Sequence, residues 1–141
     1  MAEMTMENEK KAQELYMQLQ MIQENAKQIY KQLQVAESQL MELVMTSQSL
    51  DEFRQIKENT EIFVPLNSGI FAKAELKKAD ELIVNVGANV AVKKDISSTK
   101  KLVERQVEQL RDIRERMASD LKKLTMQGGM IEEELQKLVS Q

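Results

Sequence analysis

The sequence predicts an α+β fold: a long antiparallel α-helical coiled-coil hairpin with two β-hairpins at its base. Three observations point to it. Glycine and proline interrupt the chain mainly in its middle, apolar residues repeat in heptads on both sides of that block, and apolar and polar residues alternate within it. The 141 residues suit one subunit, with helices over 9–58 and 97–139 and two β-hairpins over 61–94.

The first helix is predicted from an apolar seam whose members follow alternating steps of three and four residues. Glutamine, glutamate and lysine, which favour helix, fill most positions between them. This spacing is the heptad rule of coiled coils. The seam consists of Ala12, Leu15, Leu19, Ile22, Ala26, Ile29, Leu33, Ala36, Leu40 and Leu43.

The middle block is predicted to form four strands, at about 62–66, 70–76, 81–86 and 89–93, because its residues alternate with period two. Residues 67–69 and 87–89 are the expected hairpin turns. Pro65 cannot donate a ladder hydrogen bond, so its strand is expected to lie at an edge or to end there.

The second helix carries a matching seam, and Ser97, Ser98 or Thr99 is the expected cap. Arg114 and Gly128 are poor seam residues. The Gly128-Gly129 pair costs about 2 kcal/mol relative to two alanines, so the last turns are expected to fray or kink. The seam consists of Val103, Val107, Leu110, Arg114, Met117, Leu121, Leu124, Gly128, Ile131, Leu135 and Leu138.

Four strands leave two open edges and one uncovered apolar face, which recruit partners. Two copies would supply the roughly eight strands of a closed barrel. We therefore predict an oligomer joined through its strands. The residues expected at this interface are Val64, Ile70, Ala72, Ala74, Leu82, Val84, Val86, Val90 and Val92.

The composition argues against most kinds of catalytic and metal-binding site. The chain has no histidine and no cysteine, which removes disulfides, thiolate nucleophiles, imidazole bases and most zinc sites. We expect no enzymatic activity, no cofactor and no metal. The net charge of -3 gives no basic field for nucleic acid, and no stretch is apolar enough for a membrane span. With no secretory signal at its start, the protein is expected in the cytoplasm.

Residues 63–74 and 82–92, together with the order helix, two hairpins, helix, resemble the prefoldin family. Two hairpins instead of one indicate its alpha class. The resemblance implies a heterohexamer of two alpha and four beta-class subunits, whose hairpins assemble into a central β-barrel. It also implies an ATP-independent holdase that captures unfolded or nascent polypeptides at the coiled-coil tips and delivers them to a group II chaperonin.

Methionine placement gives candidates for client contact. Of the ten methionines, Met1, Met4, Met6, Met17 and Met21 lie early and two lie late in the chain, and an antiparallel pairing brings both groups to one end. Methionine is flexible and suits surfaces that accept many shapes. The candidates with their apolar neighbours are Met4, Met6, Leu15, Met17, Leu19, Met21, Met126, Met130, Ile131, Leu135, Leu138 and Val139.

Two alternatives stay open from the sequence. The methionines within the helices could fill the coiled coil instead of contacting a client. The chain could also be a filament-forming or scaffold coiled-coil protein of the prefoldin type, which would polymerise alone instead of forming a complex of discrete mass.

Overall fold

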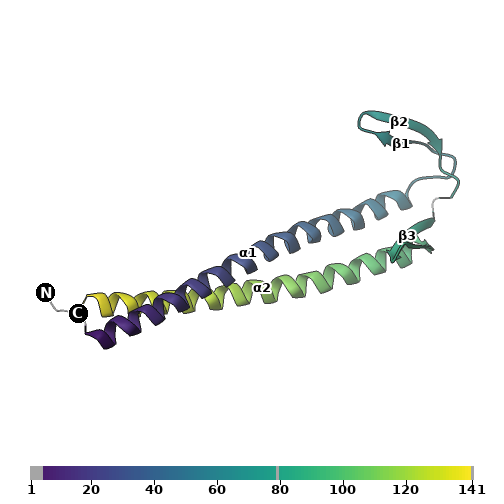
Figure 1. Ribbon diagram of the computed structural model, residues 1–141. Helices are drawn as coiled ribbons and strands as arrows, with labels where there is room; N and C mark the ends of the chain where they lie inside the picture. Colours follow the sequence, from purple (N-terminus) through teal and green to yellow (C-terminus); the bar gives the residue numbers. More distant parts are fainter. Residues whose placement is uncertain (1–4, 79, 141) are drawn as a thin grey trace. The chain divides into compact units, whose positions relative to one another are not determined.

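The computed structural model describes residues 5–78 and 80–140 (Figure 1). Two long helices enclose two antiparallel hairpins in the chain order, which confirms the predicted α+β class. Within the described residues, no helix is long and apolar enough to cross a membrane. The elements are α1 (Met6–Arg54), β1 (Glu61–Asn67), β2 (Ile70–Glu75), β3 (Glu81–Gly87), β4 (Val90–Asp95) and α2 (Ile96–Val139).

The chain divides into two compact units. The helical unit combines α1 up to Gln39 with α2 from Leu110 onward, and the hairpin unit spans Leu40–Gln109. In both units, every predicted seam residue is buried or partly buried. Arg114 is among the partly buried ones, as expected of a long side chain that packs its stem and keeps its charge in water.

The ends of α1 follow from local hydrogen bonds. The hydroxyl of Thr5 accepts a hydrogen bond from the backbone N–H of Asn8 at 3.1 Å, so the helix is capped before residue 9. At the other end, the N–H groups of Gln55 and Ile56 bond three residues back, which tightens the last turn. Asn59 then takes a left-handed conformation, with φ of 63°. α1 therefore stops at Arg54, short of residue 58.

Asp95, and not one of the three predicted hydroxyl residues, caps α2. Its Oδ1 accepts a hydrogen bond from the N–H of Ser98 at 2.7 Å. Hydrogen bonds from Ser98 lower the pKa of Asp95 below its ordinary value of 3.8. The carboxylate is therefore charged at neutral pH, and the cap weakens only as the pH falls through this lowered pKa.

α2 continues through Gly128-Gly129 to Val139, so the predicted fraying or kink is wrong for the described chain. Gly128 is buried against α1. A Cβ atom on Gly128 would lie 3.6 Å from the Ile22 side chain and 3.7 Å from that of Leu19. The packing of Gly128 against α1 thus supports a helix that the glycines alone would weaken.

The two hairpins are repeats of one another. Each has a one-residue bulge at the same position, at Leu66 in β1 and at Val86 in β3. A lysine and a glutamate on the same face also pair in each, Lys73 with Glu61 at 3.7 Å and Lys93 with Glu81 at 3.5 Å. The hairpins form two separate two-stranded sheets. The 15 residues 61–75 therefore find their counterparts 20 positions later, in 81–95.

The turns lie where the sequence predicts them. Gly69 and Gly87 have φ of 79° and 106°, a region that favours glycine. Ala88 and Asn89 both take the left-handed conformation that a tight hairpin turn requires. Pro65 lies in the middle of β1 opposite Phe71, which a two-stranded sheet tolerates because both of its strands are edges.

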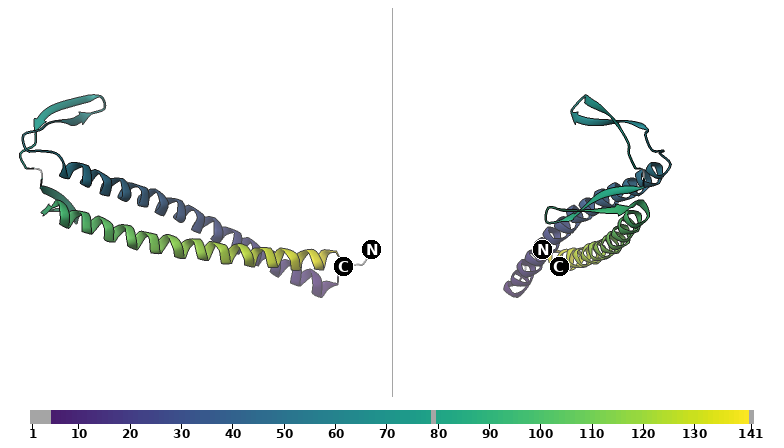
Figure 2. Two further views of the ribbon diagram at one scale, coloured as in Figure 1. Left: turned by 180° about the vertical axis from the view of Figure 1, so that it is seen from behind. Right: turned by 90° about the vertical axis from the view of Figure 1, so that its right-hand side faces the viewer.

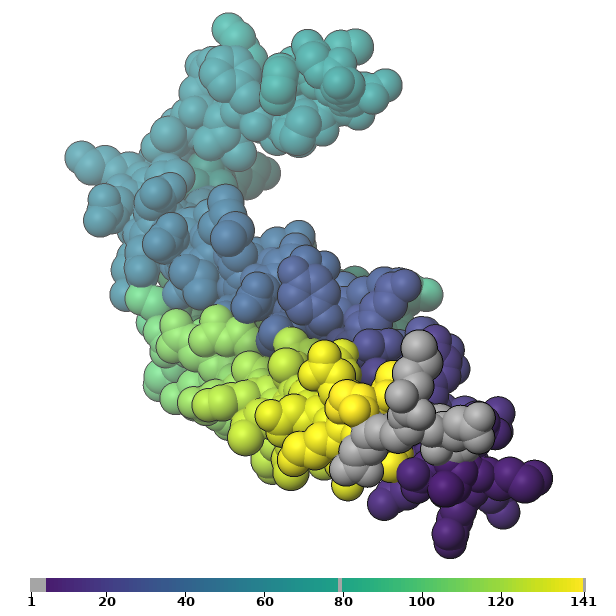
Figure 3. Space-filling model, turned by 90° about the vertical axis from the view of Figure 1, so that its left-hand side faces the viewer, coloured from purple at the N-terminus to yellow at the C-terminus, as the bar shows by residue number. Residues whose placement is uncertain are grey.

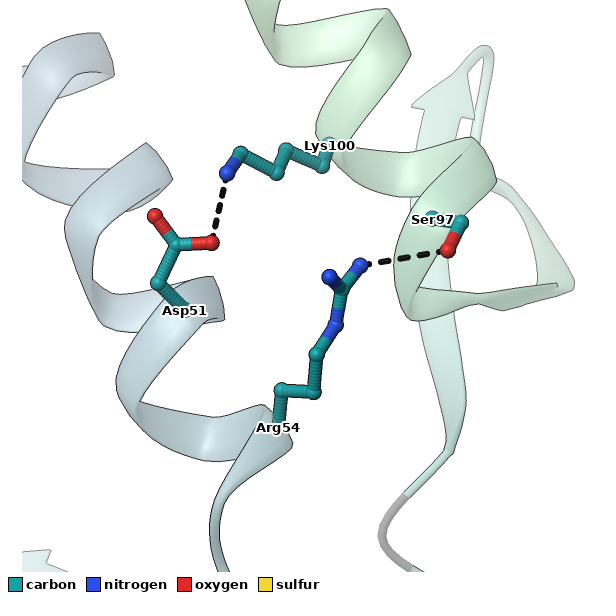
Figure 4. A network of polar contacts seen from close by, with 4 residues as sticks. All are labelled: Asp51, Arg54, Ser97 and Lys100. Atoms are coloured by element: carbon teal, nitrogen blue, oxygen red, sulfur yellow. Dashed lines mark hydrogen bonds and ion pairs between the residues drawn. The ribbon is translucent and has the colours of Figure 1, made fainter.

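Polar contacts join the two helices within the hairpin unit (Figure 4). The Lys100 ammonium pairs with the Asp51 carboxylate, and the Arg54 guanidinium donates a hydrogen bond to the Ser97 hydroxyl at 3.1 Å. The Thr99 hydroxyl is buried and donates to the carbonyl of Asp95 at 2.8 Å. The Lys100–Asp51 and Arg54–Ser97 contacts link the start of α2 to the end of α1, whereas the Thr99 bond is local to the start of α2.

Candidate functional site

The first candidate site is the end of the helical unit where α1 begins and α2 ends. The two views of Figure 2 show these helix ends side by side, and Figure 3 looks onto them. The contacts of Gly128 with Leu19 and Ile22 fix the alignment of the helices here. The early and late methionines are thereby brought to the same stretch of the coiled coil.

The methionines within this stretch lie outside the seam. Met17 and Met21 are 64% and 66% exposed, and Met126 and Met130 are 62% and 67% exposed. The alternative that these four fill the coiled coil does not fit their exposure. Met6, at the start of α1, is still more exposed, and Met4 lies outside the described residues.

The apolar neighbours of these methionines divide into three groups. Leu15 and Leu19 are buried, so they hold the seam. The partly buried residues are Ile131, Leu135 and Leu138. Val139 is exposed. At this end, then, the exposed apolar surface is supplied mainly by methionine.

Two hollows mark the surface of α2 at this end. The first, of about 540 Å³, has Ile22, Met130 and Ile131 as its apolar lining, and both Gln18 and Ile22 come from α1. The charged residues in its lining are Glu133, Glu134 and Lys137. The second, of about 440 Å³, contains Leu135 and Val139, with Glu132 and Glu133 as its charged residues. Glu133 borders both hollows, so they are neighbours.

Matched exposed methionines occur elsewhere on α1. Met41 and Met45 are 67% and 60% exposed and have the same four-residue spacing as Met17 and Met21. They belong to the hairpin unit. The chain thus contains an internal reference pair of equal chemistry and exposure.

The second candidate site is the apolar face of each hairpin. The register pairs Val64 with Ala72 and Val84 with Val92, so each pair shares one face. Strand alternation adds Ile70 and Ala74 to this face of the first hairpin, and Leu82 and Val90 to this face of the second. Val86 differs, because it is the bulge residue of β3. Exposed members of this predicted interface are Val64, Ile70, Val86 and Val90, and partly buried members are Ala72, Ala74, Leu82, Val84 and Val92.

The opposite face of the first hairpin also carries apolar residues, which are not among those predicted for the interface. Phe63 and Phe71 are 63% and 60% exposed and flank Pro65. On the second hairpin the corresponding positions are Ile83, Ala91 and Asn85, of which Ile83 is 74% exposed. The signal was available: two of the three phenylalanines in the chain occur at these alternating positions.

Comparison with known proteins agrees with this architecture. Residues 22–141 match the family model described as "Prefoldin subunit". The prefoldin subunit alpha of Methanobrevibacter smithii is 27% identical over 96% of this chain and 92% of the relative. The prefoldin subunit alpha of Archaeoglobus fulgidus is 28% identical, over 92% of this chain and 95% of the relative.

A solved structure shares the fold. In the cryo-EM structure of filamentous PFD from Methanocaldococcus jannaschii, a chain superposes with a TM-score of 0.69 at 16% identity, covering 77% of this chain and 90% of the other. The family match covers most of the chain, and curated relatives from several archaea carry the alpha designation. The chain belongs to the prefoldin family of chaperone subunits, in its alpha class.

Proposed function

We propose that this chain is a subunit of an ATP-independent holdase that captures unfolded or nascent polypeptides at its helix ends, prevents their aggregation and passes them to a group II chaperonin. The observation that carries the proposal is the set of exposed methionines outside the seam, where α1 begins and α2 ends. Thioether side chains are flexible and polarizable, so they can contact apolar segments of varied shape. The proposed place of action is the cytoplasm.

The hairpins serve assembly in this proposal. Their apolar faces and open edges would be covered in a β-barrel shared with beta-class subunits, in a hexamer of two alpha and four beta subunits. The family itself implies assembly with other prefoldin subunits. The repeat of the hairpins supports two equivalent contacts per alpha subunit, since both present an apolar face in the same register.

The test is an aggregation assay without ATP. The chain is purified with a beta-class subunit, and chemically unfolded citrate synthase serves as the client. We expect the wild-type complex to suppress the light scattering of the aggregating client. A variant with four methionines changed to Gln should need about tenfold more complex for the same suppression; the four are Met17, Met21, Met126 and Met130. Burial of about 60 Å² of apolar surface contributes about 1.5 kcal/mol, which corresponds to a tenfold change in affinity.

A control variant makes this assay decisive. The variant Met41→Gln with Met45→Gln should behave as the wild type, because it removes thioethers of the same exposure from the hairpin unit. Failure of the wild-type complex to suppress aggregation would refute the holdase proposal. Equal losses in both variants would move client contact away from the helix ends.

Filament formation is the second candidate function. It is favoured by one observation, the likeness in fold to a chain from an assembly described as filamentous. Mass measurement in solution separates the two. A discrete complex formed only with a beta-class subunit supports the chaperone hexamer, whereas polymers of growing mass formed by this chain alone support the filament.

A further inference from the structure

We propose that the end of α2 selects client segments in which apolar residues are flanked by lysine or arginine. This inference rests on the proposed capture of unfolded polypeptides and names the class of segment captured. It is carried by the two neighbouring hollows at the end of α2, whose linings combine apolar side chains with carboxylates.

The spacing of the apolar lining residues fits an extended chain. Ile131 belongs to the first hollow and Leu135 to the second. Four residues of helix rise roughly 6 Å. Alternate side chains of an extended peptide repeat at roughly 6.6 Å on one face. Two apolar side chains at positions i and i+2 of a client therefore match the spacing of Ile131 and Leu135.

The charged lining residues give the selection by charge. Glu132, Glu133 and Glu134 border the hollows, and Lys137 is the single cation in their lining. None of the ion pairs found among residues 5–78 and 80–140 uses these three glutamates. α1 contributes uncharged groups here, Gln18 and Ile22. A cationic residue beside the apolar pair would thus meet an excess of negative charge, and an anionic one would be repelled.

The experiment measures peptide binding to the assembled complex by fluorescence anisotropy. Three labelled peptides share one apolar core and carry lysine, glutamine or glutamate flanks. We expect the lysine-flanked peptide to bind roughly fivefold more tightly than the glutamine-flanked one at low salt, because several exposed charge pairs act together. This preference should shrink at high salt, where exposed charges are screened.

A matched pair of triple variants locates the effect. Glu132→Gln, Glu133→Gln and Glu134→Gln together should abolish the preference for lysine flanks. Glu104→Gln, Glu108→Gln and Glu115→Gln change the net charge of α2 equally at other exposed positions and should preserve it. Equal loss in both triples would overturn the proposal, because the preference would then follow net charge.

Other outcomes are equally informative. The absence of any flank preference in the wild type would overturn the selection while leaving the capture of apolar segments intact. If the first triple variant keeps the preference but loses binding to a group II chaperonin, the carboxylates serve chaperonin docking and the proposal is wrong. If none of the three peptides binds, the proposed holdase function fails along with the inference.

Discussion

The helical unit and the hairpins both expose apolar side chains, but of different kinds. The helices bury their leucine and isoleucine seam within the chain and expose methionines between polar residues. The hairpins expose valine, isoleucine and phenylalanine on continuous faces. β-Branched side chains are stiff and specify one geometry, whereas methionine adapts to many. The difference indicates one surface for permanent assembly and another for transient contact.

The largest expected effect concerns the apolar hairpin faces, with their stiff β-branched side chains. Val84→Asp would place a carboxylate on the apolar face of the second hairpin, and burying it in an assembly would cost several kcal/mol. We expect the complex with beta-class subunits to be lost, as measured by light scattering after size exclusion. Val84→Ile is the matched control, because it changes the same position and keeps the face apolar. An intact complex with Val84→Asp would contradict the assignment of this face to assembly.

A second change asks whether the first hairpin uses both of its faces. Phe63→Ser combined with Phe71→Ser removes two rings from the face opposite Val64. We expect the complex to dissociate at higher subunit concentration than the wild type, because each buried ring contributes about 1.5–3 kcal/mol. Ile83→Ser, at the position in the second hairpin that corresponds to Phe63, should have a smaller effect. Unchanged dissociation of the double variant would show that this face stays in water.

Glycine substitutions should have opposite signs in the two regions. Gly129 lies in a helix with no atom near its Cβ position, so Gly129→Ala should stabilise the end of α2 by about 1 kcal/mol. Amide exchange of residues 130–139 should slow about fivefold as a result. Gly87→Ala should instead destabilise its hairpin, because φ of 106° is strained for alanine. Faster exchange at the α2 end with Gly129→Ala would contradict the packing of this helix.

The smallest effect is expected at the polar contacts between the helices. Lys100→Ala removes the partner of Asp51, whose side chain is half exposed. Such pairs contribute about 0.2–1 kcal/mol, and less at high salt. Thermal unfolding of the variant and the wild type in low and high salt measures this loss of stability. A loss that is large and independent of salt would mean that Lys100 acts through packing.

Much of the fold follows from short-range pattern. The seams and the strand alternation each need only neighbours a few residues apart, and every seam position and both turns lie where they are predicted. The errors have two causes. At the start of α2, local groups compete, and Asp95 instead of Ser97, Ser98 or Thr99 accepts the capping hydrogen bond. At Gly128, packing against Leu19 and Ile22 of α1 outweighs the weak helix propensity of glycine.

The candidate site was less predictable than the fold. The heptad pattern already places Leu15 and Leu19 in the seam and Met17 outside it, but only the structure gives the exposure of Met17 and shows which late methionines lie beside it. The hollows beside Glu133 depend on how side chains pack, which no spacing rule describes. Phe63 and Phe71 were missed because the prediction considered one face of an alternating strand.

The central claim is that clients contact the methionines at the helix ends. Site-specific photo-crosslinking tests it most directly, with a benzophenone amino acid placed singly at Met17, Met21, Met126 or Met130, and at Met41 or Met45 as reference. We expect an unfolded client to crosslink from the first four positions and not from the reference pair. Equal crosslinking from Met41 and Met45, or crosslinking from those two alone, would contradict the account.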